Sequence, residues 1–112
     1  AGSFKVMQID ATRVAGPQEI VLEYLLANKF GVRVCPHAGG VGLCEAVRHF
    51  AMSDYLAVSG QWDDRVIEYV DNQHEYFVHP TEIVNGRYKA PTAPGSGVDM
   101  KLEAAERCLY KG

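Results

Sequence analysis

Residues 32–43 have the sequence Val32-Arg33-Val34-Cys35-Pro36-His37-Ala38-Gly39-Gly40-Val41-Gly42-Leu43. The apolar, β-branched start of this segment is typical of a buried strand in a parallel sheet. His37 then lies at the carboxyl end of the strand, the edge at which ligands bind in α/β sheets and barrels. The glycines that follow allow a sharp turn or a close approach of the backbone to a ligand. We therefore expect His37 to be the centre of any functional site.

The residues before this strand predict a β-loop-α-β unit. Residues 4–10 form a short strand candidate that ends in Asp10. After a loop, Pro17 opens a helix that Gly31 ends. Two strands joined through a helix in this way are parallel, with a right-handed crossover, so their carboxyl ends share one edge.

The residues after the glycine turn predict further elements. Residues 43–52 place their apolar side chains on one face and predict a second helix, and residues 55–60 form another extended run. Residues 65–71 are a third strand candidate, interrupted by Glu68. Three strands would then bring polar side chains to one edge: Asp10, His37 and Glu68.

The last third of the chain has a different character. The Asn85-Gly86 pair between short apolar runs predicts a hairpin over residues 82–89. Residues 90–97 form a loop rich in proline and glycine, and residues 101–110 predict a short terminal helix.

The composition limits the classes of partner. The 112 residues are 47% hydrophobic and 22% charged, which is ordinary for one globular domain. The net charge of −3 and the lack of a basic cluster argue against nucleic acid as a partner. No apolar run reaches the roughly 20 residues that a membrane span needs. Cys35, Cys44 and Cys108 lack the spacing of a metal site, so we expect reduced thiols in an intracellular protein, cytoplasmic or mitochondrial.

Two interpretations of the predicted edge stay open. Asp10 beside His37 would fix the tautomer of the imidazole and make it a general base. Alternatively, Asp10 caps the following loop and His37 is a structural histidine. Glu68 in an apolar run needs a partner or a role, such as a hydrogen bond to a ligand or a metal, unless its strand is exposed on one face. The glycine turn lacks the lysine of a phosphate-binding loop, so a tight turn beside a substrate is the better interpretation.

Four segments of the sequence carry a family resemblance. Residues 8–13, 34–45, 67–71 and 85–88, with Ala90-Pro91 and Pro94-Gly95, resemble the carboxyl-terminal part of the L-fuconate dehydratase family. This family belongs to the mandelate racemase subgroup of the enolase superfamily. The resemblance covers nearly the whole chain, and its Pro-His-Ala-Gly-Gly-Val-Gly-Leu segment is long and distinctive.

The resemblance implies a fold and a domain organisation. The chain would be the α/β carboxyl-terminal portion of a modified TIM barrel, (β/α)₇β, and would hold the last three strands. Residues 1–78 would form the last strands and helices of the barrel. Residues 79–112 would form the hairpin and the tail that returns to an α+β capping domain.

The resemblance also implies a reaction. Family members remove the proton α to the carboxylate of a sugar acid, form a Mg²⁺-stabilised enediolate and expel the β-hydroxyl, which gives a 2-keto-3-deoxy sugar acid. By position, Asp10 matches the aspartate of the His-Asp dyad and His37 matches the histidine acid/base. Glu68 matches the glutamate at the end of the eighth strand.

The sequence also departs from the family. The Lys-x-Lys motif and the three carboxylate ligands of the metal lie on earlier strands and are not in these 112 residues. Three strands cannot close an eight-stranded barrel, and the chain starts at Ala1, close to a strand. We therefore expect a partial or processed polypeptide without metal ligands, held by the rest of a longer chain or by copies of itself and inactive when isolated.

Two alternatives to the dehydratase remain. One is a non-catalytic, self-associating product, and the other is a superfamily enzyme of different sugar-acid specificity.

Overall fold

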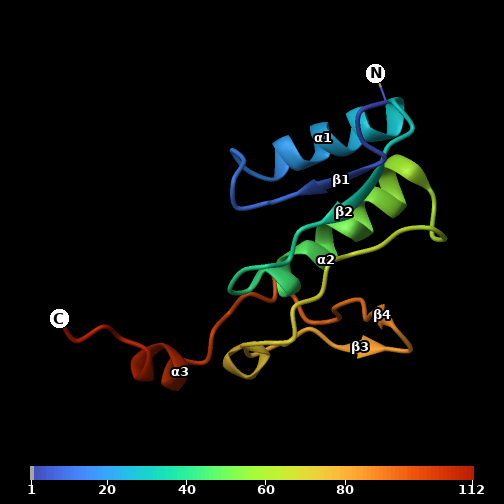
Figure 1. The fold of residues 1–112 in the computed structure, drawn as a ribbon. Coiled ribbons are helices and arrows are strands. Elements are labelled where there is room, and N and C mark those ends of the chain that lie inside the picture. The colour runs from blue at the N-terminus through green and yellow to red at the C-terminus, as the bar shows by residue number, and fades with distance from the viewer. Residues whose placement is uncertain (1) are drawn as a thin grey trace.

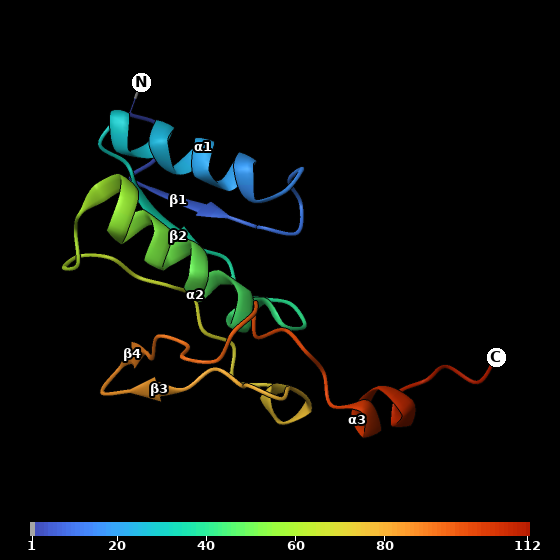
Figure 2. The same ribbon diagram turned by 180° about the vertical axis from the view of Figure 1, so that it is seen from behind.

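A parallel pair of strands and two long helices form the body of the chain in the computed structural model, which describes residues 2–112 (Figure 1). The elements follow in the order β1 (Val6–Ile9), α1 (Pro17–Lys29), β2 (Arg33–Pro36), α2 (Leu43–Ser53), a π-helical segment (Asp54–Ser59), a 3₁₀ turn (His74–Tyr76), β3 (Ile83–Val84), β4 (Arg87–Tyr88) and α3 (Leu102–Arg107). In two opposite views, α3 and the carboxyl terminus lie far from β1 and α1 (Figures 1 and 2).

The β1–α1–β2 unit confirms the first part of the sequence prediction. Pro17 starts α1, and Gly31, with φ of +65°, follows the helix at a conformation that favours glycine. The strands are parallel, with Ile9 opposite Pro36, and the His37 N–H donates to the Ile9 carbonyl at 2.8 Å. Because both strands end at the same level, the residues that follow them lie at one edge of the sheet.

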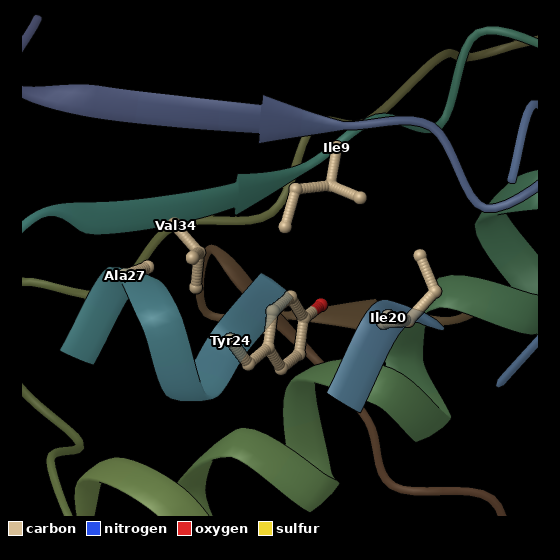
Figure 3. Close-up of a cluster of buried hydrophobic side chains, with 5 residues drawn as sticks. All are labelled: Ile9, Ile20, Tyr24, Ala27 and Val34. Atoms are coloured by element: carbon tan, nitrogen blue, oxygen red, sulfur yellow. The ribbon is translucent and has the colours of Figure 1, made fainter. Parts of the chain in front are cut away.

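The main core lies between the strands and α1. Ile9 and Val34 point from the sheet toward three side chains of α1, which are Ile20, Tyr24 and Ala27 (Figure 3). All five are at most 6% exposed. A second cluster lies around Ala38, Leu43, Cys44 and Val47, where the glycine turn enters α2. The two clusters fix the strand ends relative to both helices.

The predicted strand over residues 65–71 is wrong, and with it the prediction of three paired strands. Its one backbone bond to the sheet runs from the Glu68 N–H to the Pro36 carbonyl, at 3.2 Å. The segment runs beside β2 but forms no ladder with it, and no strand within residues 2–112 borders it on the other side. A strand pairs its backbone groups in a continuous ladder with at least one neighbour, and one bond to Pro36 does not make such a ladder.

Two other predictions also need correction. The extended run predicted over residues 55–60 is a π-helical continuation of α2, closed by Gly60 at φ +61°. A short apolar run is compatible with either structure, so its periodicity did not distinguish them. The terminal helix is shorter than predicted and spans Leu102–Arg107.

The hairpin confirms the Asn-Gly signal. Ile83 pairs with Tyr88 and Val84 with Arg87. Asn85 and Gly86 have φ of +52° and +73°, the pair of positive values that a type I′ turn requires.

Buried charges attach the chain before the hairpin to α2. Glu45 and Arg48 are 1% and 5% exposed. Oε1 of Glu45 accepts hydrogen bonds from His74 Nδ1 at 2.8 Å and from the Thr81 N–H at 3.1 Å. Nη2 of Arg48 donates to the His79 carbonyl at 3.3 Å. A buried carboxylate with two donors is well satisfied, so this network holds the hairpin segment beside α2.

Candidate functional site

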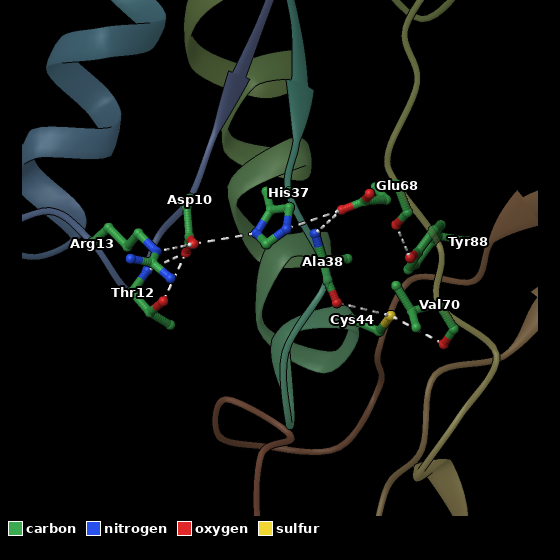
Figure 4. Close-up of polar contacts among 9 residues, drawn as sticks. All are labelled: Asp10, Thr12, Arg13, His37, Ala38, Cys44, Glu68, Val70 and Tyr88. Atoms are coloured by element: carbon green, nitrogen blue, oxygen red, sulfur yellow. Dashed lines mark hydrogen bonds and ion pairs between the residues drawn. The ribbon is translucent and has the colours of Figure 1, made fainter.

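The structure brings the three predicted side chains together at the carboxyl edge of the strands (Figure 4). Asp10 follows β1, His37 follows β2, and Glu68 comes from the extended segment beside β2. Nδ1 of His37 lies 3.3 Å from Oδ2 of Asp10, and Nε2 lies 3.6 Å from Oε2 of Glu68. The imidazole therefore lies between two carboxylates, one facing each ring nitrogen.

Local bonds hold both carboxylates in place. Asp10 accepts from the Thr12 N–H at 2.9 Å, from the Thr12 hydroxyl at 2.7 Å and from Nε of Arg13 at 3.1 Å. The two bonds from Thr12 lower the pKa of Asp10, and His37 and Arg13 contribute in the same direction. Oε2 of Glu68 accepts from the Ala38 N–H at 2.7 Å. The Asp10 carboxylate is thus ionised at neutral pH and faces His37.

Gly39 gives the imidazole its space. A Cβ atom on Gly39 would lie 2.7 Å from Nε2 of His37 and 3.2 Å from Cε1. Real Cβ contacts essentially never come that close, so the ring occupies the volume that a side chain at position 39 would fill. The glycine turn therefore leaves room for the imidazole ring, and its placement beside a substrate stays a prediction.

The cysteine thiols are the other titratable groups to consider near the site. Burial and the nearby Glu68 charge raise the pKa of the Cys35 thiol, which makes it a poor nucleophile. Cys35, Cys44 and Cys108 are all free thiols.

Sequence reasoning missed three contributors to the site: Cys44, Tyr88 and the Ala38 N–H. The Tyr88 hydroxyl donates to the Glu68 carbonyl, and the Cys44 thiol lies 3.9 Å from the Ala38 carbonyl. The sequence marks Tyr88 only as the end of a hairpin, and a buried cysteine only as a small apolar residue. It also gives no sign that His74 would meet Glu45.

The described residues do not fit a metal ion by themselves. Within residues 2–112, no group of three or more His, Cys, Asp or Glu side chains is placed to hold one. Asp10 and Glu68 lie at opposite nitrogens of His37, so the ring separates the two carboxylates. A Mg²⁺ ion needs several oxygen ligands around one point, and these two cannot supply them together.

A cavity formed by the described residues does not include the three site residues. Its volume is about 590 Å³, and its lining includes Tyr55, Trp62 and Arg87, but not Asp10, His37 or Glu68. Residues 2–112 contain no helix long and apolar enough to cross a membrane.

The fold and the site define an α/β chain whose ionisable groups gather at the carboxyl edge of parallel strands. Comparison with known proteins identifies the family. The model of the family described as "Enolase C-terminal domain-like" matches residues 1–105. The chain belongs to this family, the carboxyl-terminal domain of the mandelate racemase/muconate lactonizing branch of the enolase superfamily.

Two relatives and one solved structure illustrate the match. The chain is 43% identical to L-galactonate dehydratase of Hypocrea jecorina, over 99% of this chain and 24% of that protein. It is 43% identical to human mitochondrial enolase superfamily member 1, over 98% of this chain and 25% of that protein. The crystal structure of that human protein superposes with a TM-score of 0.90, covering 95% of this chain and 24% of that one.

A more distant relative is D-galactarolactone cycloisomerase of Agrobacterium fabrum, which is 30% identical over 93% of this chain and 29% of that protein. The chain thus spans about a quarter of the length of the curated relatives it matches.

Proposed function

We propose that the full-length protein carrying this chain is an acid-sugar dehydratase. The observation that carries the proposal is the placement of His37 between Asp10 and Glu68 at the edge where α/β barrels hold their active sites. The 43% identity to a protein named L-galactonate dehydratase supports the same class of reaction. L-Fuconate is the substrate that the sequence resemblance favours, and the two sugar acids are tested side by side below.

Each of the three residues has a role in the proposed reaction. The α C–H bond and the β C–O bond of the sugar acid break, water leaves, and the enol product rearranges to a 2-keto-3-deoxy acid. His37 acts as acid/base through Nε2, either giving a proton to the departing hydroxyl or protonating the intermediate. Asp10 orients the ring through Nδ1, and Glu68, when protonated, donates a hydrogen bond to the developing negative oxygen.

The proposal also concerns what lies outside these residues. The chain would supply the last strands of the barrel over residues 1–78 and a tail to the capping domain over residues 79–112. The rest of the chain or further copies would complete the barrel. The Mg²⁺ that the family resemblance implies would take its ligands from the part of the protein outside residues 1–112, since the described residues do not fit a metal ion. The cytoplasm or the mitochondrion would be the compartment, the latter in keeping with the name of the human relative.

Turnover by the full-length protein tests the proposal. Formation of the 2-keto-3-deoxy product is measured with L-fuconate and L-galactonate for the wild type, His37→Asn and His79→Asn. His79 has an exposed side chain and contributes only its carbonyl to the network, so its substitution is the matched control. We expect activity to be lost in His37→Asn alone. Undiminished turnover by His37→Asn would refute the role of His37.

A second specificity is supported by one comparison. The relative that is 30% identical is named a cycloisomerase of a sugar lactone, so the same carboxyl-terminal scaffold accompanies more than one reaction on sugar acids. The two candidates differ in product: a dehydratase releases a keto acid and water, whereas a cycloisomerase releases an isomer of its substrate. Mass analysis of the product distinguishes them.

A further inference from the structure

The position of Glu68 has a structural explanation that lies outside its own segment. Residues 65–71 are not part of a sheet, and one backbone bond joins Glu68 to β2. The Ala38 N–H bonds the carboxylate of Glu68 at 2.7 Å, and the N–H of Glu68 is bonded to Pro36. A further group must bond the carbonyl of Glu68 if the main chain of this weakly paired segment is to be fixed.

That group is the phenol of Tyr88. Its hydroxyl donates a hydrogen bond to the carbonyl of Glu68, while the N–H of Glu68 donates to Pro36 on the other side. The Tyr88 ring also packs edge-on against Tyr69, with 5.9 Å between the ring centroids. Both polar groups of the Glu68 backbone are thus bonded, one to β2 and one to β4.

Two features make Tyr88 a persistent donor. Burial, and then its contact with Cys44, raise the pKa of Tyr88, so the phenol keeps its proton throughout the neutral range.

Cys44 is 3% exposed, and its thiol lies 3.9 Å from the carbonyl of Ala38 and 3.8 Å from that of Val70. The thiol therefore lies between the two segments that carry His37 and Glu68 (Figure 4).

We propose that Tyr88 is a positioning residue, which holds Glu68 at its working distance from His37 by bonding the Glu68 carbonyl from the hairpin. The hairpin is thus part of the site, although its side chains do not touch the imidazole. The inference rests on the proposed function, because it assigns Tyr88 to the same reaction.

Tyr88→Phe in the full-length protein tests the inference. The substitution removes only the hydroxyl and keeps the ring against Tyr69. We expect kcat to fall about tenfold, KM to change less than about twofold, and the pH profile of kcat to shift, because Glu68 is displaced relative to His37. Tyr69→Phe is the matched control. Its hydroxyl bonds the exposed Asp71 at 3.3 Å rather than the site, so kcat should stay within about twofold of the wild type.

A second measurement does not depend on activity. In Tyr88→Phe, the amide hydrogen of Glu68 should exchange at least about fivefold faster, whereas that of Val32, bonded to Ala27 at 2.8 Å, should be unchanged. An unchanged Glu68 exchange rate, or a kcat within twofold of the wild type, overturns the inference. The inference is also overturned if the loss of kcat is fully explained by a smaller amount of folded protein.

His37→Asn separates this inference from the proposed function. If His37→Asn is inactive and Tyr88→Phe is fully active, only the role of Tyr88 is wrong. If His37→Asn is active, both are wrong.

Discussion

Nδ1 of His37 is buried, makes no hydrogen bond of good geometry within residues 2–112, and faces Oδ2 of Asp10 at 3.3 Å. Thr12 bonds the other carboxylate oxygen, Oδ1, through its N–H and its hydroxyl, whereas Nε of Arg13 shares Oδ2 with the ring. We infer that Asp10 orients the ring with the proton on Nδ1 and leaves Nε2 to exchange protons with a substrate.

Asp10→Asn should therefore disturb catalysis more than binding. An amide is not charged and can present its NH₂ group to the ring, so the tautomer is no longer fixed. We expect kcat of the full-length protein to fall about 10- to 100-fold with little change in KM, measured by steady-state kinetics. Asp63→Asn, at an exposed loop position, is the control. Equal kcat values for Asp10→Asn and the wild type would show that the contact does not matter.

Gly39→Ala should displace the imidazole. The new methyl group would lie 2.7 Å from Nε2 of His37, so the ring must move. Gly40→Ala is a closely matched control, because its methyl group meets the flexible end of Leu43 instead. We expect kcat to fall at least about tenfold in the first variant and less than about threefold in the second, with thermal unfolding measured for both. Equal kinetic effects in the two variants would contradict this function of Gly39.

The positions of Asp10 and His37 could be predicted because they depend on local sequence. Each residue ends a strand of one β–α–β unit, and parallel strands end at the same edge. Pro17, Gly31 and the Asn85-Gly86 pair mark helix and turn boundaries by backbone preferences that need no tertiary contact. Periodicity and turn chemistry therefore sufficed to predict that Asp10 and His37 lie at one edge.

Glu68 and the chain around it could not be predicted in the same way. Whether residues 65–71 form a strand depends on a continuous ladder with a neighbouring strand, and the sequence of the segment does not contain that neighbour. The bonds from Glu45 to His74 and to Thr81 join residues 29 and 36 positions apart. A buried carboxylate and a largely buried histidine carry no local pattern that indicates such a pairing.

Glu45→Gln should loosen the hairpin segment. The carboxylate is 1% exposed and accepts from both His74 and Thr81, so the substitution removes the charge that His74 requires. The amide oxygen still accepts, but a hydrogen bond to a charged group contributes about 1.5–3 kcal/mol and one to a neutral group about 0.5–1.5 kcal/mol, so we expect the free energy of unfolding to fall by about 1–2 kcal/mol. Urea unfolding measures the change, and Glu103→Gln, which is exposed on α3, is the control. Equal free energies of unfolding for Glu45→Gln and the wild type would contradict this prediction.

The same pair predicts a pH dependence of stability. Burial acts against both charges, but the hydrogen bonds with His74 and Thr81 outweigh it and lower the pKa of Glu45. In the same way, the hydrogen bonds of His74 with Glu45 and with the Val70 carbonyl raise the pKa of His74. The stabilisation that His74 provides is complete below pH 6.5, its ordinary pKa, and is lost as the pH rises through its raised pKa. The stabilisation that Glu45 provides is complete above pH 4.5, its ordinary pKa, and is lost as the pH falls through its lowered pKa.

The pair should therefore stabilise the fold most between pH 4.5 and 6.5. Urea unfolding of the wild type and of His74→Asn, from below pH 4.5 to above pH 6.5, measures it. The stability difference between the two should shrink on either side of the window, and a difference independent of pH would exclude the ion pair as its source.

The outer face of α1 predicts that the 112-residue chain associates when it is alone. Ile20, Tyr24 and Ala27 face the core, yet the other side of the helix exposes apolar side chains that are 41–49% accessible: Val21, Leu22, Leu25 and Leu26. A helix that is apolar all round is normally buried all round. The radius of gyration of 15.3 Å also exceeds the roughly 13 Å of a compact domain of this length.

Light scattering of the isolated chain measures this association. We expect an apparent mass well above the 12.3 kDa of one chain. The double variant Leu22→Lys/Leu25→Lys should bring the mass down toward that value, because two charges cannot be buried in an apolar contact without a partner. Thr92→Lys/Ser96→Lys adds the same charge at exposed loop positions and should leave the mass unchanged. A wild-type chain that stays monomeric would mean that this face of α1 tolerates water, and that the chain does not depend on a partner surface there.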